Sequence, residues 1–253
     1  MTYEANRRVE TSARTLRIIE HLSEVGSIGV STLANELGLN KGIVHNHLST
    51  LRERGYVRKI GGEYRLSPKM LTTGIRCRSN DELYLHSNEL LADFANRHDR
   101  GVVLFVRAAT ECHVVSTYRV PTRHVLDTGV TVPVRQSLPG KVILEAETPT
   151  GGGEPSPAHG DETIAHSLDS SGYVTGPLTP GLSSKLVVLP VIDGQANCHG
   201  AFGVLLHGGE EESRVQSIAE SASALRERIE TRFSPDKSSE RSFATEKHSW
   251  LNK

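Results

Sequence analysis

The chain has 253 residues, of which 36% are hydrophobic and 5% aromatic, and its formal net charge is −1. This length gives room for two ordinary folded domains, and the composition excludes a disordered chain. No apolar run approaches the roughly 20 residues that a membrane-spanning helix needs. The polar N-terminus shows no signal peptide, and the three cysteines are too scattered for a disulfide framework, so we expect a cytoplasmic protein.

The most informative segment is residues 31–56, which has the pattern of two short helices joined by a tight turn. Ser31 stands where an N-cap belongs, and the first helix is expected to end at Gly38. Asn40 is expected to cap the second helix. Apolar residues recur in this second helix at i, i+4 and i+7, as Val44, Leu48 and Leu51.

The other side of the second helix is left free for DNA. Stepping 100° per residue from the apolar stripe identifies the positions on the opposite and flanking sides. A helix of this kind can enter the major groove and present these positions to bases and phosphates. The candidates for DNA contact are Lys41, Gly42, Ile43, His45, Asn46, Ser49 and Thr50.

The neighbouring segments complete a winged helix. Residues 14–25 carry apolar side chains at helical spacing and predict a first helix that braces the other two. Residues 56–60 and 63–66 flank Gly61-Gly62, a strong signal for a two-residue hairpin. The hairpin is basic, and we expect three of its side chains to lie against the phosphate backbone: Arg58, Lys59 and Arg65.

Charge separates the two ends of the chain. Residues 1–80 contain 13 Lys or Arg and 7 Asp or Glu, a net charge of +6. Because the whole chain has 29 Lys or Arg and 30 Asp or Glu, the remaining residues contain 16 and 23 of these, a net charge of −7. A basic module fits a nucleic-acid binder, because neutralising phosphates releases counterions. The alternative is a winged helix that contacts another protein, since a charge of +6 is modest.

After the hairpin, two helices are predicted, one beginning at Ser67-Pro68 and the next at Asp81. The pattern then changes to strands, which we expect at residues 101–107, 111–120, 130–134, 185–192 and 199–207. Further helices are expected at residues 138–147, 161–171 and 210–233. Strands flanked by helices indicate an α+β sensor-type domain, and the polar segment 234–253 is expected to be disordered.

Three blocks of sequence, in this order, resemble the IclR family of transcriptional regulators over roughly residues 11–232. The blocks are residues 33–57 with 64–66, residues 133–144, and residues 172–174 with 189–193. The resemblance implies an α+β chain with a winged helix-turn-helix (1–67), linker helices (68–99) and a GAF-like effector-binding and oligomerisation domain (100–233). It also implies a homodimer or tetramer that binds a palindromic operator and responds to a small metabolite, often a carboxylic acid.

The recognition helix departs from the family pattern. Relatives usually carry Pro-Lys-Ser-Thr-Val-His-Arg where this chain has residues 40–46, so two hydroxyls and an arginine are missing. Asn46 can pair bidentately with an adenine, which discriminates against a wrong base by about 1–3 kcal/mol, and Ile43 can contact a thymine methyl. We therefore expect a shifted operator sequence, with reduced affinity as the competing outcome.

The effector domain departs as well. Three sheet positions that often carry Cys or small polar residues in relatives are apolar or glycine here, and Arg135 stands at a common His position. A carboxylate is expected to bind the N–H groups at the start of the 137–145 helix together with Arg135. The alternative is a vestigial pocket in a domain that only dimerises. The expected effector-binding residues are Arg135, Ser137, Gly140, Lys141, Leu186, Gly203 and Leu205.

The sequence shows no pattern of a catalytic or metal site. His45 and His47 are two apart on a helix, unlike the i, i+4 pairs that chelate a metal. Cys112 and Cys198 each precede a His on a strand, where neighbours point to opposite faces, although a meeting of these two thiols across the sheet stays open. We expect no metal, no cofactor and no enzymatic activity. The predicted function is a ligand-responsive DNA-binding regulator; the alternative is a winged-helix interaction or scaffold protein.

Overall fold

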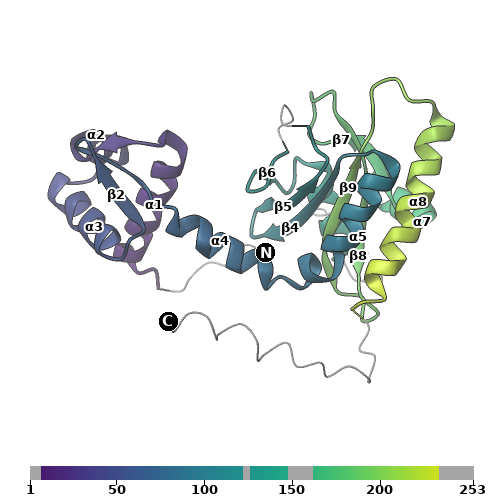
Figure 1. Ribbon diagram of the computed structural model, residues 1–253, viewed down its shortest axis with the longest axis horizontal. Helices are drawn as coiled ribbons and strands as arrows, with labels where there is room; N and C mark the ends of the chain where they lie inside the picture. The colour runs from purple at the N-terminus through teal and green to yellow at the C-terminus, as the bar shows by residue number, and fades with distance from the viewer. Residues whose placement is uncertain (1–6, 122–125, 148–161, 234–253) are drawn as a thin grey trace. The chain divides into compact units, whose positions relative to one another are not determined.

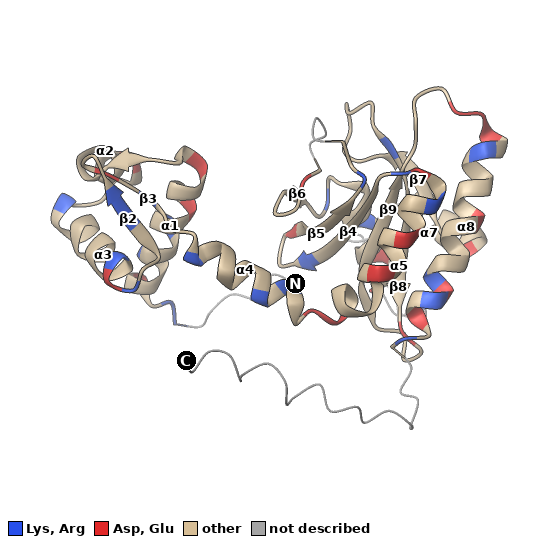
Figure 2. Ribbon diagram, in the orientation of Figure 1, with Lys and Arg blue, Asp and Glu red and all other residues tan. Residues whose placement is uncertain are grey.

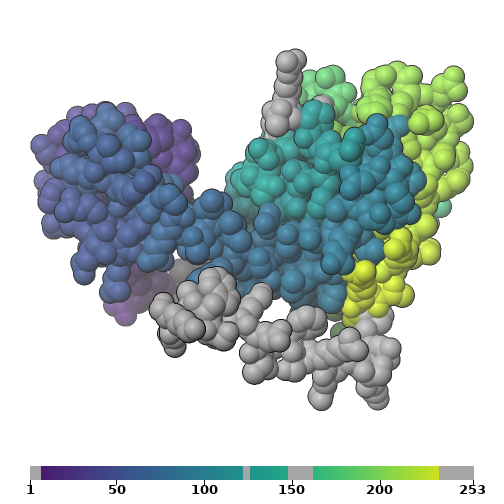
Figure 3. All heavy atoms as spheres, viewed as in Figure 1, coloured from purple at the N-terminus to yellow at the C-terminus, as the bar shows by residue number. Residues whose placement is uncertain are grey.

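The computed structural model describes residues 7–121, 126–147 and 162–233. It divides the chain into two compact units, Met1–Asp81 and Glu82–Lys253 (Figure 1). Each unit has its own buried apolar core, and Figure 3 shows the surface of each unit from the side seen in Figure 1. The expected linker, residues 68–99, spans the division, so its two helices belong to different units. The expected disordered tail, residues 234–253, lies outside the described residues.

Unit 1 is a winged helix with one additional helix. Its elements are α1 (Glu10–Val25), β1 (Ile28–Gly29), α2 (Val30–Leu37), α3 (Lys41–Glu53), β2 (Val57–Ile60), β3 (Glu63–Leu66) and α4 (Lys69–Ser79). The strands form an antiparallel sheet in the order β1-β3-β2. The predicted hairpin at Gly61-Gly62 is confirmed, and both glycines have positive φ. Strand β1 was not predicted, because two residues are too short to show a period.

The boundaries of α2 follow from two glycines. The helix ends at Gly38, whose left-handed backbone (φ 65°) lets its N–H bond to a carbonyl of the last turn, as predicted. The prediction of Ser31 as N-cap was wrong. The chain passes directly from β1 into the helix, so Gly29 is the N-cap, with extended backbone, and Ser31 lies inside the first turn.

Unit 2 is built on a six-stranded antiparallel sheet in the order β6-β5-β4-β9-β8-β7. Its strands are β4 (Val102–Ala108), β5 (Glu111–Tyr118), β6 (Thr131–Pro133), β7 (Val174–Pro177), β8 (Lys185–Ile192) and β9 (Cys198–Leu205). Its helices are α5 (Glu82–His98), α6 (Leu138–Ala146), α7 (Glu162–Ser171) and α8 (Glu212–Glu230). Strand β7, which holds a Gly and a Pro at the sheet edge, was not predicted.

The sheet of unit 2 has an apolar core on each face. One core joins the sheet to α5 and α8 and contains Leu91, Phe94 and Phe202. The other joins it to α6 and α7 and contains Phe105 and Ile143. The α+β class predicted from the sequence is confirmed. Among the helices that the structure describes, none combines the length and apolar composition of a membrane span.

The order of the strands also settles the question of the two cysteines. Cys112 on β5 and Cys198 on β9 lie on either side of β4, so their strands are separated by about 10 Å, twice the usual strand spacing. A disulfide needs Cα atoms within about 7 Å. Both thiols are free, and they are not positioned to form a disulfide with each other.

Candidate nucleic-acid interface and effector site

The expected recognition helix, α3, is held by its cap and by its apolar stripe. The Asn40 side-chain oxygen accepts a hydrogen bond from the Gly42 N–H at 2.8 Å, as predicted for an N-cap. The three stripe residues are buried in the core of unit 1: Val44, Leu48 and Leu51. This core also includes Ile18 and Leu22 of α1, so the first helix braces α3 in the way the sequence indicated.

Further contacts orient α3 that the sequence pattern did not reveal. The Thr15 hydroxyl and His47 Nδ1 lie 2.9 Å apart, which ties α1 to the core-facing side of α3. At the other end, Lys69 Nζ donates to the Arg54 carbonyl at 2.6 Å and lies 4.5 Å from the Tyr56 ring centroid. These pairs are 13 or more residues apart, so no local spacing could have identified them. Their effect is to fix the direction in which the free face of α3 points.

The free face of α3 is on the surface of unit 1. All seven candidate residues on this helix are exposed: Lys41, Gly42, Ile43, His45, Asn46, Ser49 and Thr50. Ile43 is 37% exposed although it is a large apolar side chain, and Thr50 donates its hydroxyl to the Asn46 carbonyl at 3.2 Å. The Asn46 amide side chain is exposed on this face.

The three cations of the wing do not form a single row. Arg58 and Arg65 are directly opposite one another in the β2–β3 register, so they share one face, and Lys59 lies on the other, 5.2 Å from the Tyr64 ring centroid. Arg65 is half-buried and donates to the Ser27 hydroxyl at 3.4 Å. Arg58 and Lys59 are exposed. In Figure 2, where Lys and Arg are blue, this colour appears on β2 and again on α3 and α4.

The expected effector positions on the sheet of unit 2 lie inside a packed core. Leu186 is completely buried, and Leu205 belongs to the same apolar cluster beneath α6. A Cβ added to Gly203 would come within 2.9 Å of the Leu186 side chain and within 3.3 Å of the Phe105 ring. Side chains of neighbouring strands therefore occupy the space above Gly203, where the sequence argument expected a ligand.

The start of α6 offers no free N–H group for a carboxylate, which corrects the expected mode of binding. The Leu138 N–H donates to the Leu178 carbonyl at 2.8 Å, and residue 139 is proline. The Gly140 N–H donates to the Ser137 hydroxyl, and the Lys141 N–H to the Ser137 carbonyl. These contacts satisfy the donors that a helix N-terminus otherwise presents to an anion.

The remaining expected effector residues are divided between interior and surface. Ser137 and Gly140 are buried, and a Cβ on Gly140 would collide with the Val134 carbonyl oxygen at 2.1 Å, so this glycine is needed for close packing. Arg135 is exposed and Lys141 is half-buried. Of the expected set, Arg135 and Lys141 are the two cationic side chains that reach the surface. Among the described residues there is no cluster of three potential metal ligands.

Comparison with known proteins gives matches to both units. Residues 11–61 match the family model of the IclR helix-turn-helix domain. The glycerol operon regulatory protein of Streptomyces coelicolor is 30% identical over 120 residues, which span 46% of this chain and 47% of that protein. The match therefore spans about half the length of this relative.

Solved structures resemble the chain over most of its length. The IclR transcriptional regulator of Alicyclobacillus acidocaldarius has a TM-score of 0.68 at 19% identity, and the match covers 89% of this chain and 99% of that one. The IclR of Thermotoga maritima gives 0.67 at 16% identity, covering 89% and 99%. An IclR homologue of Microbacterium hydrocarbonoxydans, complexed with 4-hydroxybenzoate, gives 0.67 at 15% identity, covering 87% and 98%.

These relatives are named as transcriptional regulators, in agreement with the expectation that the chain is not an enzyme. At such identities the solved structures show the fold alone, while the family model identifies the helix-turn-helix domain of unit 1 by sequence. The resemblance read from the sequence is confirmed: unit 1 contains an IclR helix-turn-helix domain, and the chain has the fold of IclR-type transcriptional regulators.

Proposed function

We propose that this chain regulates transcription by binding a palindromic DNA operator through α3, and that a small metabolite bound by unit 2 changes its affinity for that operator. The exposed polar face of α3, set on a fully buried apolar stripe, is the observation that carries the proposal. A helix held in this way can enter the major groove without disturbing its own core.

The contacts of the DNA-binding surface divide into two kinds. Asn46 and Ile43 are proposed to read bases, since an amide can pair with adenine and an apolar side chain can contact the thymine methyl. Lys41, Arg58 and Lys59 are exposed cations proposed to contact phosphates. Arg65, half-buried and bonded to Ser27, is proposed to hold the wing in shape as well as to add positive charge.

A homodimer is proposed from the surface of α4. None of its 11 residues is buried within the protomer, and Leu71 and Ile75, one turn apart, are 66% and 44% exposed. An isolated helix shorter than about 12–15 residues is marginal in water. A second copy of the chain would cover this stripe, and its two-fold symmetry would place two α3 helices in successive major grooves, about 34 Å apart.

A small carboxylic acid is the proposed effector class, which is the class of 4-hydroxybenzoate in the Microbacterium hydrocarbonoxydans homologue. Because the N–H groups of α6 are already bonded, the carboxylate would have to be held by side chains, with Arg135 and Lys141 as candidates. The filled space above Gly203 favours a second candidate function, in which unit 2 holds no ligand and the chain is an interaction or scaffold protein.

The proposal is tested by selecting duplexes from a random pool with the full chain and measuring affinity for the enriched sequence by fluorescence anisotropy from low to moderate salt. We expect the logarithm of the affinity to fall linearly with the logarithm of salt concentration. Replacing Arg58 and Lys59 with Gln should weaken binding to every duplex and flatten this slope. Arg228→Gln on α8 is the matched control and should change neither. Failure to enrich any duplex would favour the scaffold function.

The effector part is tested by repeating the titration with 4-hydroxybenzoate and with short aliphatic carboxylates. We expect a shift in operator affinity that Arg135→Gln reduces. Unchanged affinity with every acid would support a ligand-free unit 2 while leaving the DNA-binding part of the proposal intact.

A further inference from the structure

A hollow in unit 2 lies on the opposite side of the sheet from the packed core at Leu186 and Gly203. It has a volume of about 440 Å³ and lies between the end of α5 and the first turns of α8. Ile218, which lines it, belongs to the core on the α5–α8 face. The hollow is therefore separate from every residue that the sequence assigned to effector binding.

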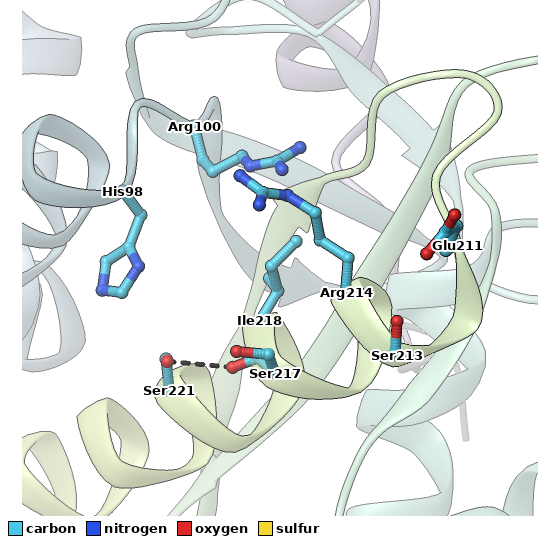
Figure 4. A pocket seen from close by; sticks show the side chains of 8 residues that line it. All are labelled: His98, Arg100, Glu211, Ser213, Arg214, Ser217, Ile218 and Ser221. Carbon is cyan, nitrogen blue, oxygen red and sulfur yellow. Dashed lines mark hydrogen bonds between the residues drawn. The ribbon is translucent and has the colours of Figure 1, made fainter.

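Two arginines meet at this hollow from different elements. Arg100, between α5 and β4, is only 3% exposed; it donates to His207 Nδ1 at 2.8 Å and pairs with Glu210. Arg214 lies in the first turn of α8, and its side chain makes no hydrogen bond or ion pair with any residue that the structure describes. Figure 4 shows the two side chains extending toward one another across the hollow. Glu210 pairs with Arg100, whereas Arg214 makes no ion pair with the described residues; Glu211 is the carboxylate that lines the hollow with it.

The start of α8 adds donors on the same side. Its N-cap residue, Glu211, makes no side-chain capping bond. The Glu211 carbonyl accepts hydrogen bonds from the N–H groups of Arg214 and Val215. The N–H groups of Glu212 and Ser213 accordingly have no partner among the described residues. This differs from α6, where the corresponding donors are all bonded. Unpaired N–H groups in the first turn of a 19-residue helix favour an anion.

The lining of the hollow also contains hydroxyl groups, an imidazole and one carboxylate, whose negative charge disfavours an anion. Ser213, Ser217 and His98 provide further hydrogen-bonding groups around the hollow. Glu211 also lines it, but Figure 4 shows this side chain beyond Arg214, at the end away from His98. The region between His98 and the two guanidinium groups is therefore bordered by Arg100, Arg214 and neutral donors, and the carboxylate nearest to Arg100 is its ion-pair partner Glu210.

We propose that this hollow binds a small anion of the phosphate type, either free phosphate or the phosphate group of a small metabolite. Guanidinium groups bind phosphate oxygens through paired N–H donors, and helix N-termini bind the same group. A volume of about 440 Å³ exceeds what one phosphate needs and leaves room for an organic portion. Unit 2 would then bind an anion between α5 and α8, at a site separate from the carboxylate site proposed at Arg135.

His98 provides a local reporter of binding. Burial lowers its pKa, and the neighbouring positive charges of Arg97 and Arg100 lower it further. Its ring is stacked on Phe94, with centroids 4.2 Å apart, so it is held in place. The other charged groups at the hollow are Arg214 and Glu211 of its lining and Glu210, which pairs with Arg100. A bound phosphate dianion would offset the positive charges and raise the pKa of His98.

The test uses the full chain without DNA. Calorimetric titration with inorganic phosphate is compared with chloride at matched ionic strength, and the pKa of His98 is followed by NMR with and without phosphate. We expect phosphate to bind where chloride does not and to raise the pKa of His98. A phosphate monoester such as glycerol 2-phosphate, titrated in parallel, distinguishes an organic ligand from the free ion by its tighter binding.

Arg214→Gln should weaken phosphate binding about tenfold or more, because it removes a charged donor, and should abolish the shift at His98. Arg214→Lys should restore part of the affinity. Arg228→Gln, an equal change of charge on the same helix, should have no effect and controls for phosphate bound at the basic surface of unit 1. Equal affinities in the Arg214→Gln and Arg228→Gln proteins, or a pKa of His98 that phosphate does not move, would overturn the proposal.

Discussion

The two units differ in where they place the residues expected to contact a ligand. In unit 1 the expected positions of α3 are all on the surface, above a stripe that is completely inside. In unit 2 the expected sheet positions, Leu186, Gly203 and Leu205, are all inside, and their neighbours fill the space around them. The positions expected from the sequence to contact a ligand thus lie on an available surface in one unit and in a packed core in the other.

The reason lies in the geometry of the two kinds of element. A helix on the surface of a small domain has one apolar stripe, so the residues opposite that stripe must face solvent. A strand in the middle of a sheet covered on both faces is apolar throughout, and its inward residues look alike whether they line a cavity or fill one. For unit 2, only three-dimensional packing distinguishes the two cases.

The largest expected effect tests the packed core directly. Leu186→Ala should lower the free energy of unfolding by about 2–5 kcal/mol, because it removes a fully buried side chain and leaves a cavity. Denaturant unfolding measured at unit 2 is the appropriate assay, and Leu182→Ala, at an exposed leucine, is the matched control. A loss as small as that of the control would mean that Leu186 lines an open pocket.

A smaller effect is expected at Gly203. Gly203→Ala should destabilise the protein by about 1–3 kcal/mol, because the new methyl group meets the Leu186 side chain and the Phe105 ring. In a Leu186→Ala background the same substitution should cost less, since the obstructing side chain is gone, and the pair should deviate from additivity. Strict additivity in urea unfolding would contradict the contact between these two positions.

In unit 1 the corresponding test concerns the support of α3. Asn40→Ala should cost about 1 kcal/mol, because it removes the side-chain acceptor for the Gly42 N–H. The change is measured by thermal or denaturant unfolding. Asn40→Asp, which keeps an acceptor at the cap, is expected to retain most of the stability; a loss equal to that of alanine would show that the side-chain acceptor is not what stabilises the start of α3.

The smallest expected effect is chemical and compares the thiols of the two units. Burial raises the pKa of Cys112 to about 12 and that of Cys198 to about 11, because the thiolate is penalised in an apolar surrounding. Cys77 in unit 1 is exposed. Titration of native protein with a thiol reagent at pH 8 should therefore modify one cysteine rapidly, and Cys77→Ser should remove that reaction. Fast modification of all three would contradict the burial in unit 2.

Much of unit 1 could be predicted from the sequence, because its signals are local. The Asn40 cap, the end of α2 at Gly38 and the hairpin at Gly61-Gly62 each depend on residues a few positions apart. The strand β1 and the hydrogen bond between Thr15 and His47 could not be predicted, since they depend on partners far along the chain.

Unit 2 was predicted in outline and less well in detail. Most strands and helices were found from their apolar periods, but the state of the α6 N-terminus depends on the Leu178 carbonyl, 40 residues from Leu138. The hollow between α5 and α8 could not be predicted from the sequence for a similar reason. Arg100 and Arg214 have no shared motif in the sequence, and only the packing of α8 on the sheet brings them to one place.

The central claim is that the exposed face of α3 reads DNA sequence, and that Asn46 determines part of it. The most direct measurement is selection of duplexes from a random pool with the unaltered chain and with Asn46→Ala, followed by affinity measurements on both sets. We predict that the variant loses discrimination at one base position in each half-site, by about 1–3 kcal/mol, while Lys59→Gln weakens all duplexes alike. Identical enriched sequences for the unaltered chain and Asn46→Ala would contradict the account.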